Sequence, residues 1–300
     1  MTLSKHRHLF RAAELLIVGL AAGALASCGG GQDAGASPSP TPGSGAPIVY
    51  AAIGASDAIG YGSSAPCVPF TACPDGRGYV PLATRELGQD GSTVTLTNLG
   101  IPGAVMSPTI QGIGNQYGRG IQGNFLEQEM PFVPRSSTLV TVFAGGNDTN
   151  AIATAVDRGA GGADPNGYID GEVQTFANDY AALVRGIRQR APTARIVALN
   201  LPNLAGLPYT TRFTSAQKRY IRRISVGFSR EGANALTAEG VVVIDLLCDP
   251  RSYQASNYSS DGFHPNDAGY AFMAAELVKA IRAAGSPRPQ GDCSFMRIVG

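Results

Sequence analysis

Short runs of β-branched and aliphatic residues alternate with longer segments of helical periodicity along most of this 300-residue chain. Nearly continuous apolar runs of this kind are typical of strands that are covered on both faces. Because parallel strands need helical crossovers, the alternation predicts an α/β fold with a mainly parallel sheet. We therefore expect a three-layer sandwich whose five-stranded sheet uses residues 48–53, 94–99, 138–143, 195–199 and 241–244.

Three longer segments have the pattern of helices that pack on this sheet. The first helix in chain order is amphipathic, because its apolar residues recur at spacings of three and four: Val173, Phe176, Tyr180, Leu183 and Ile187. The second is predicted over residues 215–236, with Thr214 or Ser215 as its N-cap. The last one starts near residue 267.

Four polar or glycine-rich motifs lie where the predicted strands end or where the last helix begins. Gly-Ala-Ser-Asp at 54–57 follows the first strand, and Asn-Leu-Gly-Ile-Pro-Gly at 98–103 ends the second. Gly-Gly-Asn-Asp at 145–148 follows the third strand, and Asp-Gly-Phe-His at 261–264 precedes the last helix. Since ligands of open α/β sheets bind beyond the carboxyl ends of the strands, these motifs are expected to converge on one site.

Beyond the N-terminal leader, the chain has a single histidine, His264. Chemistry that needs an imidazole near neutral pH must therefore use this side chain. The same count excludes a multi-histidine metal centre in the mature protein, and the sequence predicts no metal or cofactor.

The four motifs, in this order, resemble the blocks of the SGNH hydrolases, the GDSL-type esterase and lipase superfamily, over roughly residues 48–284. The resemblance implies a flavodoxin-like sheet and the hydrolysis of a carboxylic ester. It also implies a nucleophile, a base with its acidic partner, and three donors that form an oxyanion hole. By this resemblance, the nucleophile is Ser56, the base is His264 and its acidic partner is Asp261. The oxyanion donors are the amides of Ser56 and Gly103 and the side chain of Asn147.

The chemistry of these residue types supports the same roles. A serine hydroxyl becomes a good nucleophile when a base takes its proton as it attacks. His264 can do this if one ring nitrogen faces Ser56 while an acceptor such as Asp261 holds the other. The negative charge that develops on a tetrahedral intermediate then needs fixed hydrogen-bond donors.

One position departs from the family pattern. The usual Gly-Asp-Ser is Gly-Ala-Ser here, with Ala55 before the serine and Asp57 after it. The missing aspartate is not the nucleophile, so catalysis is compatible with the change, but the support of the serine loop is expected to differ.

Each motif also has an interpretation without catalysis. Ser56 and Asp57 are residues that cap helices, 145–148 contains only turn formers, and Asp267 is a plausible cap of the last helix. A non-catalytic surface protein that binds glycan or lipid is therefore the alternative from another class. Within the enzyme class, the candidate substrates are lipid or short-chain acyl esters, with O-acetylated polysaccharide as the alternative.

The first 27 residues are typical of an export signal, with a basic start and a short apolar core. They end in Leu-Ala-Ser-Cys, which resembles the lipobox of bacterial lipoproteins, so Cys28 is the predicted lipidation site. Residues 28–46 have the composition of a disordered Gly/Ser/Pro linker, and 47–300 are expected to form the hydrolase domain. We thus expect an exported protein that is lipid-anchored to a bacterial membrane.

Charge and cysteine content fit an exported protein. Removal of residues 1–27 takes away three of the 23 basic and one of the 22 acidic residues, which leaves a net charge of −1 and gives no electrostatic case for binding nucleic acid. Four cysteines remain beyond Cys28, and an even number predicts two disulfides. Of three possible pairings we favour Cys67–Cys73 and Cys248–Cys293.

Overall fold

The computed structural model describes residues 40–43, 45–71, 73–285 and 288–299. The predicted signal sequence 1–27, the lipidation site Cys28 and most of the linker 28–46 lie outside these residues. In the part of the chain that is described, no helix is both long and apolar enough to cross a bilayer.

A five-stranded parallel sheet forms the centre of the fold, in the order β2-β1-β3-β4-β5. All four neighbouring strand pairs are parallel. The strands are β1 (Ile48–Gly54), β2 (Val94–Asn98), β3 (Leu139–Phe143), β4 (Arg195–Leu199) and β5 (Val242–Ile244). The predicted α/β three-layer sandwich is confirmed, and each strand begins and ends within one residue of its expected bounds.

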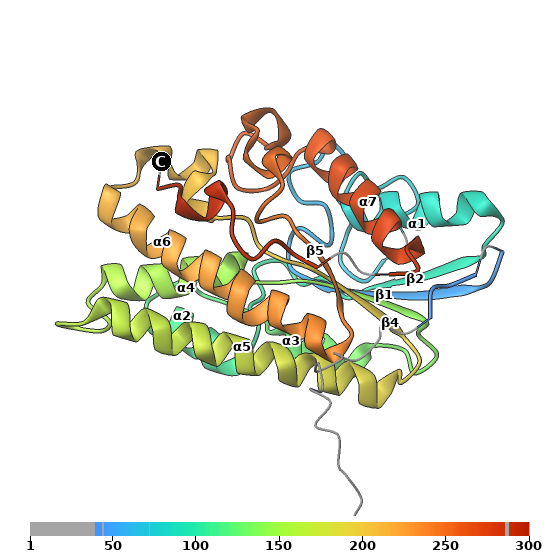
Figure 1. Ribbon diagram of the computed structural model, residues 1–300, viewed down its shortest axis with the longest axis horizontal. Helices are drawn as coiled ribbons and strands as arrows, with labels where there is room; N and C mark the ends of the chain where they lie inside the picture. The colour runs from blue at the N-terminus through green and yellow to red at the C-terminus, as the bar shows by residue number, and fades with distance from the viewer. Residues whose placement is uncertain (1–39, 44, 72, 286–287, 300) are drawn as a thin grey trace, which may run out of the picture. The chain divides into compact units, whose positions relative to one another are not determined.

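Helices cover both faces of the sheet, because side chains of successive strand residues point to opposite sides. Tyr50 and Ala52 of β1 belong to the core under one pair of helices, α1 (Tyr79–Leu87) and α7 (Asp267–Arg282), which lie together in Figure 1. Ala51 and Ile53 belong to the core on the opposite face. The helices there are α2 (Pro108–Gln116), α3 (Phe125–Gln128), α4 (Gly146–Asp157), α5 (Pro165–Arg190) and α6 (Ser215–Gly227).

Short 3-10 turns complete the connections between these elements. They are η1 (Gly88–Asp90), η2 (Met130–Phe132), η3 (Leu204–Gly206), η4 (Pro208–Arg212), η6 (Asn234–Glu239), η7 (Pro250–Tyr253), η8 (Ala255–Asn257) and η9 (Ser294–Arg297).

The predicted helix over 215–236 is correct at its start and wrong at its end. Thr214 caps α6 through a capping box with Gln217. The α-helix stops at Gly227 and continues as a π-helical turn, η5 (Phe228–Ala233). Phe228 stacks on Phe176 of α5 with the ring centroids 3.8 Å apart, so packing against α5 changes the local winding.

The start of α7 also differs from the sequence-based expectation. Its N-cap is Asn266, whose side-chain oxygen accepts from the amides of Ala268 and Gly269. Asp267, the expected cap, instead accepts hydrogen bonds from the backbone amide and hydroxyl of Ser64, at 2.7 and 2.6 Å. This pair links the segment after β1 to the start of α7.

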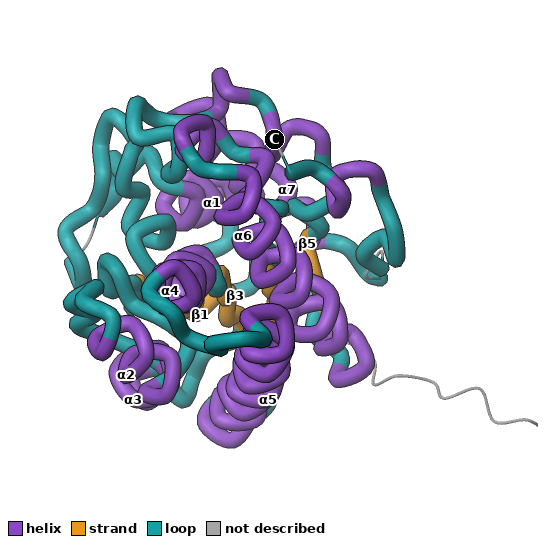
Figure 2. The backbone as a smooth tube through the Cα atoms, turned by 90° about the vertical axis from the view of Figure 1, so that its left-hand side faces the viewer, coloured by secondary structure: helices purple, strands orange, loops and turns teal. Residues whose placement is uncertain are grey.

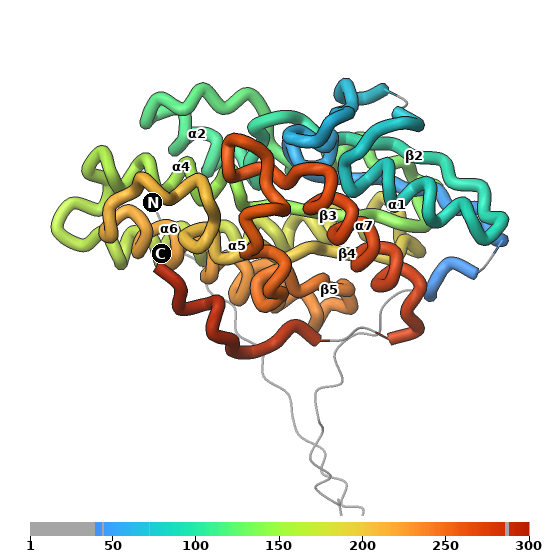
Figure 3. Tube along the Cα trace, turned by 90° about the horizontal axis from the view of Figure 1, so that it is seen from above, coloured from blue at the N-terminus to red at the C-terminus, as the bar shows by residue number. Residues whose placement is uncertain are grey.

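The strand order has a switch point between β1 and β3. From β1 the chain continues to β2 on one side, whereas from β3 it continues to β4 and β5 on the other side. In doubly wound folds of this order, ligands bind at that point. Figure 3 shows the blue segment that follows β1 beside the orange-red segment that precedes α7. Motifs far apart in the sequence therefore meet at this edge of the sheet.

Candidate active site

Ser56 lies two residues after the end of β1, in a tight turn at the carboxyl edge of the sheet. The amide of Tyr61 donates to the Ser56 carbonyl at 2.9 Å, which closes this turn. Just before it, the Gly54 amide donates to Oε2 of the buried Glu129 at 2.9 Å. Burial raises the pKa of the Glu129 carboxyl well above its ordinary value, against the effect of the backbone hydrogen bonds. The turn is thus closed by a backbone hydrogen bond at Ser56, and a buried side chain holds the backbone just before it.

A chain of hydrogen bonds joins the three residues that the sequence assigns to proton transfer. Oγ of Ser56 lies 2.8 Å from Nε2 of His264. Nδ1 of the same ring lies 2.6 Å from Oδ2 of Asp261. These are hydrogen-bonding distances, and the two ring nitrogens have different partners. The arrangement has the geometry of a nucleophile, a base and an orienting carboxylate.

Asp261 is held in place by its second oxygen. Oδ1 accepts from the backbone amides of Phe263 and His264, at 2.8 and 2.9 Å, and from the hydroxyl of Ser259 at 2.9 Å. Burial alone would raise the pKa of this carboxyl, but its hydrogen bonds outweigh that effect and lower the pKa to about 2. Asp261 therefore carries its charge at neutral pH and favours a proton on the facing Nδ1.

Two residues that sequence reasoning missed pack against His264. The ring of Tyr61 meets the imidazole edge-on, with the centroids 4.7 Å apart. Gly62 has a φ of +93°, and a Cβ added there would lie 2.8 Å from the Cβ of His264 and 2.7 Å from the carbonyl oxygen of Pro265. Only a glycine fits this conformation and this space. A glycine near the nucleophile was visible in the sequence, but nothing there places it against residue 264.

Gly103, in the loop after β2, and Asn147, at the start of α4, are the predicted oxyanion donors and belong to neighbouring segments. Asn147 is at the start of α4, and its Nδ2 donates to the carbonyl of Ala104 at 3.1 Å. A carboxamide nitrogen has two hydrogens, so this bond leaves one for another acceptor. Gly103 is exposed and has a φ of +78°, a conformation that favours glycine. The side chain of Asn147 therefore lies beside the backbone that carries Gly103.

Two buried polar side chains support these loops. Oδ1 of Asp148 accepts from the amide of Met106 at 2.7 Å, which joins the start of α4 to the loop after Gly103. Burial raises the pKa of Asp148 to about 7, against the lowering effect of that hydrogen bond. Asn98 donates to the carbonyl of Ala58 at 2.7 Å and accepts from the amide of Gly100 at 3.1 Å. The second motif is thereby tied to the turn that holds the serine.

Asp57 does not take the place of the absent aspartate before the serine. Its Oδ1 lies 3.5 Å from the hydroxyl of Tyr270, which donates to the carbonyl of Tyr61 at 2.7 Å. Burial raises the pKa of Asp57, and the charge of His264 opposes this effect. Ala55 is buried and has no polar side chain to offer. Support of the serine loop thus comes from Glu129 and Asn98, residues distant in sequence.

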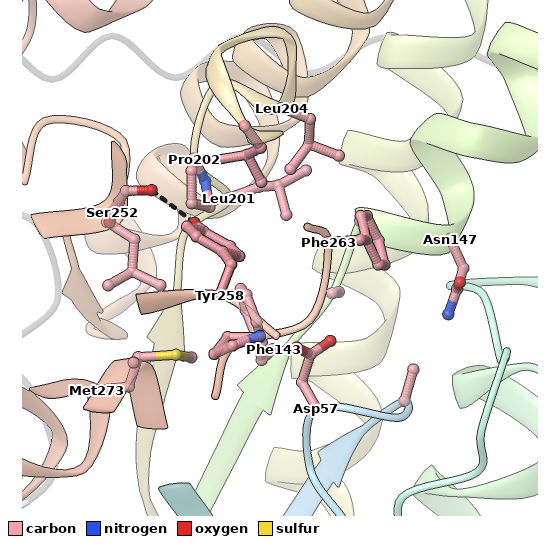
Figure 4. Close-up of a pocket in the computed structure, with 18 of the residues that line it drawn as sticks. Asp57, Phe143, Asn147, Leu201, Pro202, Leu204, Ser252, Tyr258, Phe263 and Met273 are labelled. Atoms are coloured by element: carbon pink, nitrogen blue, oxygen red, sulfur yellow. Dashed lines mark hydrogen bonds between the residues drawn. The ribbon is translucent and has the colours of Figure 1, made fainter. Parts of the chain in front are cut away.

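A cavity of about 50 Å³ lies next to these loops. Ala55, Ala104 and Asn147 line it on the side of the proposed oxyanion donors, whereas Ser56 and His264 are not among its lining residues. Figure 4 shows Phe263 and Tyr258 around this space, with the Tyr258 hydroxyl donating to the Ser252 carbonyl at 2.5 Å.

Both favoured disulfides are present. Cys67 and Cys73 close a small loop in the segment between β1 and α1. Cys248 and Cys293 join the segment after β5 to the C-terminal tail. Within the described residues, no group of three or more His, Cys, Asp or Glu side chains is arranged to hold a metal ion.

Comparison with known proteins adds independent information. A family model described as the GDSL-like Lipase/Acylhydrolase family matches residues 52–272. Among solved structures, the lipase Lip_vut3 from a goat rumen metagenome is similar, with a TM-score of 0.52 and 19% identity over 79% of this chain and 98% of that one. The extracellular lipase from Streptomyces rimosus has a TM-score of 0.51 and 17% identity over 78% and 99%. At this identity the structural likeness concerns the fold. No curated protein matches the chain.

Proposed function

Because this chain belongs to the GDSL-like lipase/acylhydrolase family, we propose that it cleaves carboxylic esters through an acyl-enzyme formed on Ser56. The family membership makes the chain an enzyme of the esterase/lipase type. The observation that supports the proposed mechanism best is the hydrogen-bond chain from Ser56 through His264 to Asp261.

In the first step, Oγ of Ser56 attacks the ester carbonyl carbon while its proton moves to Nε2 of His264. The imidazolium that forms is stabilised by Asp261, which faces its Nδ1–H. The negative charge on the former carbonyl oxygen is then bound by three donors. We assign these to the amides of Ser56 and Gly103 and to the free N–H of the Asn147 carboxamide.

Collapse of the tetrahedral intermediate breaks the bond to the alcohol oxygen, which takes the proton from His264 as it leaves. A water molecule then attacks the acyl carbon and gives one proton to the same Nε2. That proton returns to Oγ of Ser56 as the carboxylic acid is released, so the enzyme ends as it began.

The test is the hydrolysis of p-nitrophenyl butyrate by the purified protein. Ser56→Ala is expected to lower kcat by roughly 10⁶-fold, by analogy with serine proteases. A fluorophosphonate probe should label the protein with Ser56 and leave Ser56→Ala unlabelled. Undiminished turnover by Ser56→Ala would refute the mechanism, and a native protein that neither labels nor hydrolyses esters would favour a binding protein.

We further propose that the natural substrate is a lipid or a short-chain acyl ester. A series of p-nitrophenyl esters of increasing acyl length, assayed beside acetylated xylan, separates the two classes of substrate. Faster release of acetate from the xylan than from any acyl ester would reject this proposal in favour of a polysaccharide O-acetylesterase.

We also propose that the enzyme is exported and anchored to a bacterial membrane by a lipid on Cys28. The sequence of residues 1–27 and the small residues before Cys28 support this proposal. Metabolic labelling with an alkyne fatty acid should mark the protein and should fail for Cys28→Ser. A Cys28→Ser protein that still sediments with membranes and carries the label would contradict it.

A further inference from the structure

Glu129 is a fully buried residue at the end of α3, and the proton transfers of the proposed mechanism do not use it. Figure 2 shows α2 and α3 on the other side of β1 from α1 and α7. Oε2 of Glu129 accepts from the Gly54 amide at 2.9 Å, whereas Oε1 is buried without a hydrogen-bond partner among the described residues. Within the same residues, the carboxyl forms no ion pair.

A carboxyl in such surroundings is costly to bury. Desolvation disfavours its charged form, and burial raises the pKa of Glu129 well above its ordinary value. Even as a neutral acid, a buried polar group that is only partly hydrogen-bonded costs stability, and an apolar side chain of similar size often costs less. The residue is therefore better explained by the backbone that it holds than by the stability that it adds.

The backbone at Glu129 leads to both main-chain donors of the proposed oxyanion hole. Gly54 precedes Ser56 by two residues, and Ile101 precedes Gly103 by the same number. The Ile101 amide donates to the Gly54 carbonyl at 3.2 Å. The same amide also acts on the Glu129 carboxyl, whose pKa it lowers. One carboxyl thus lies where the end of β1 meets the loop after β2.

The segment before Glu129 is itself paired with that loop. The Val105 amide donates to the carbonyl of Gly123 at 3.1 Å, and the Val105 carbonyl accepts from the amide of Phe125 at 2.9 Å. These bonds hold the start of α3 against the backbone that follows Gly103. The Glu129 side chain therefore reaches the end of β1 from a fixed position on the loop that carries the second donor.

We propose that Glu129 is a positioning residue for the oxyanion hole, whose carboxyl sets the spacing between the amides of Ser56 and Gly103 by holding Gly54 at the end of β1. The inference rests on the proposed function, since these amides are the donors assigned to the tetrahedral intermediate. Such donors must lie about 3 Å from the developing oxyanion, and a misplacement of about 1 Å can cost 10²-fold in rate.

The kinetic test compares Glu129→Gln and Glu129→Met with the native full chain on p-nitrophenyl butyrate. Glutamine is neutral and keeps an acceptor oxygen at the same reach, whereas methionine has a similar length and no such acceptor. Glu129→Met should lower kcat about 10- to 100-fold and leave KM within about threefold, because the donors act on the transition state. Glu129→Gln should keep kcat within about threefold of the native value.

Tyr50→Phe is the matched control, since it removes a buried hydrogen bond of 2.9 Å to Thr141 from the same strand, β1. It should leave kcat unchanged, which separates the position of the donors from a general loss of stability. If Glu129→Met kept kcat within about twofold, or if Glu129→Gln were equally slow, the positioning role would be overturned while the proposed function stood.

Hydrogen exchange of the backbone amides tests the same link without catalysis. In Glu129→Met, segments 54–57 and 101–104 should exchange about 10-fold faster than in the native protein, and in Glu129→Gln they should exchange at the native rate. Segment 195–199 of β4 should be unchanged in both variants. Unchanged exchange of the first two segments overturns the inference. The expected pattern in a protein that hydrolyses no ester overturns the proposed function instead, and the link between the two loops stands.

Discussion

Gly62→Ala tests whether the position of His264 depends on the segment after the nucleophile. The added methyl group would lie 2.8 Å from the Cβ of His264, whereas carbon atoms in contact are normally about 3.5 Å apart or more. If the histidine yields, it must move by about 0.7 Å. Since a misplacement of about 1 Å can cost 10²-fold in rate, we expect kcat to fall roughly 10- to 100-fold.

The same substitution also strains the backbone, so a matched control is needed. Gly91 has a φ of +87°, close to the +93° of Gly62, but a Cβ added to Gly91 would meet no atom within 4 Å. Both alanine variants should lose about 1–2 kcal/mol of stability from the left-handed conformation. This corresponds to a fall in Tm of roughly 2–8 °C.

The assay measures kcat on p-nitrophenyl butyrate and the rate of fluorophosphonate labelling, well below the Tm of each variant. Gly62→Ala should be slow in both measurements, and Gly91→Ala should match the unmodified protein in both. If Gly62→Ala kept its kcat within about twofold, or if Gly91→Ala lost as much, contact with His264 would not be what Gly62 contributes.

Three more outcomes are expected. Asn147→Ala should lower kcat by about 10²–10³-fold with a smaller change in KM, and an equal loss of substrate binding would contradict its role as an oxyanion donor. The pKa of Asp261 is lowered to about 2 in the fold, so its contribution to stability is present above the unfolded value near 4 and is lost as the pH falls toward 2. Urea unfolding at pH 5 and pH 3 should therefore show a smaller pH effect in Asp261→Asn than in the native protein. Replacing Cys248 and Cys293 by serine should cost about 4 kcal/mol, because their bridge joins positions 45 residues apart, and a calorimetric Tm unchanged from the native value would refute this estimate.

Much of the site was predictable because local patterns carry it. The strands are apolar runs, and each motif follows an element that the pattern identifies. Parallel strands bring their carboxyl ends to one edge, so Ser56 and His264 meet although 208 residues separate them. The disulfide pairings were favoured for a similar reason, since one closes a short loop and the other attaches the tail.

Other features depended on packing that no local pattern records. The helix over 215–236 has a good helical pattern throughout, yet the contact of Phe228 with Phe176 ends its α-helical winding at Gly227. At the start of α7, Asn266 and Asp267 are equally good caps by residue type. The position of Ser64, which binds the aspartate, leaves the cap to the asparagine.

By itself, the sequence determined the class of fold, the histidine that lies among the motifs and the groups with which it can work, because these follow from periodicity, composition and the order of motifs. Tertiary structure alone decided which residues support them, such as Gly62 against His264 and Glu129 at the start of the turn of Ser56. The reason is physical. Contacts between distant segments depend on how helices and loops pack around the sheet, and that packing is a property of the whole chain rather than of any one stretch.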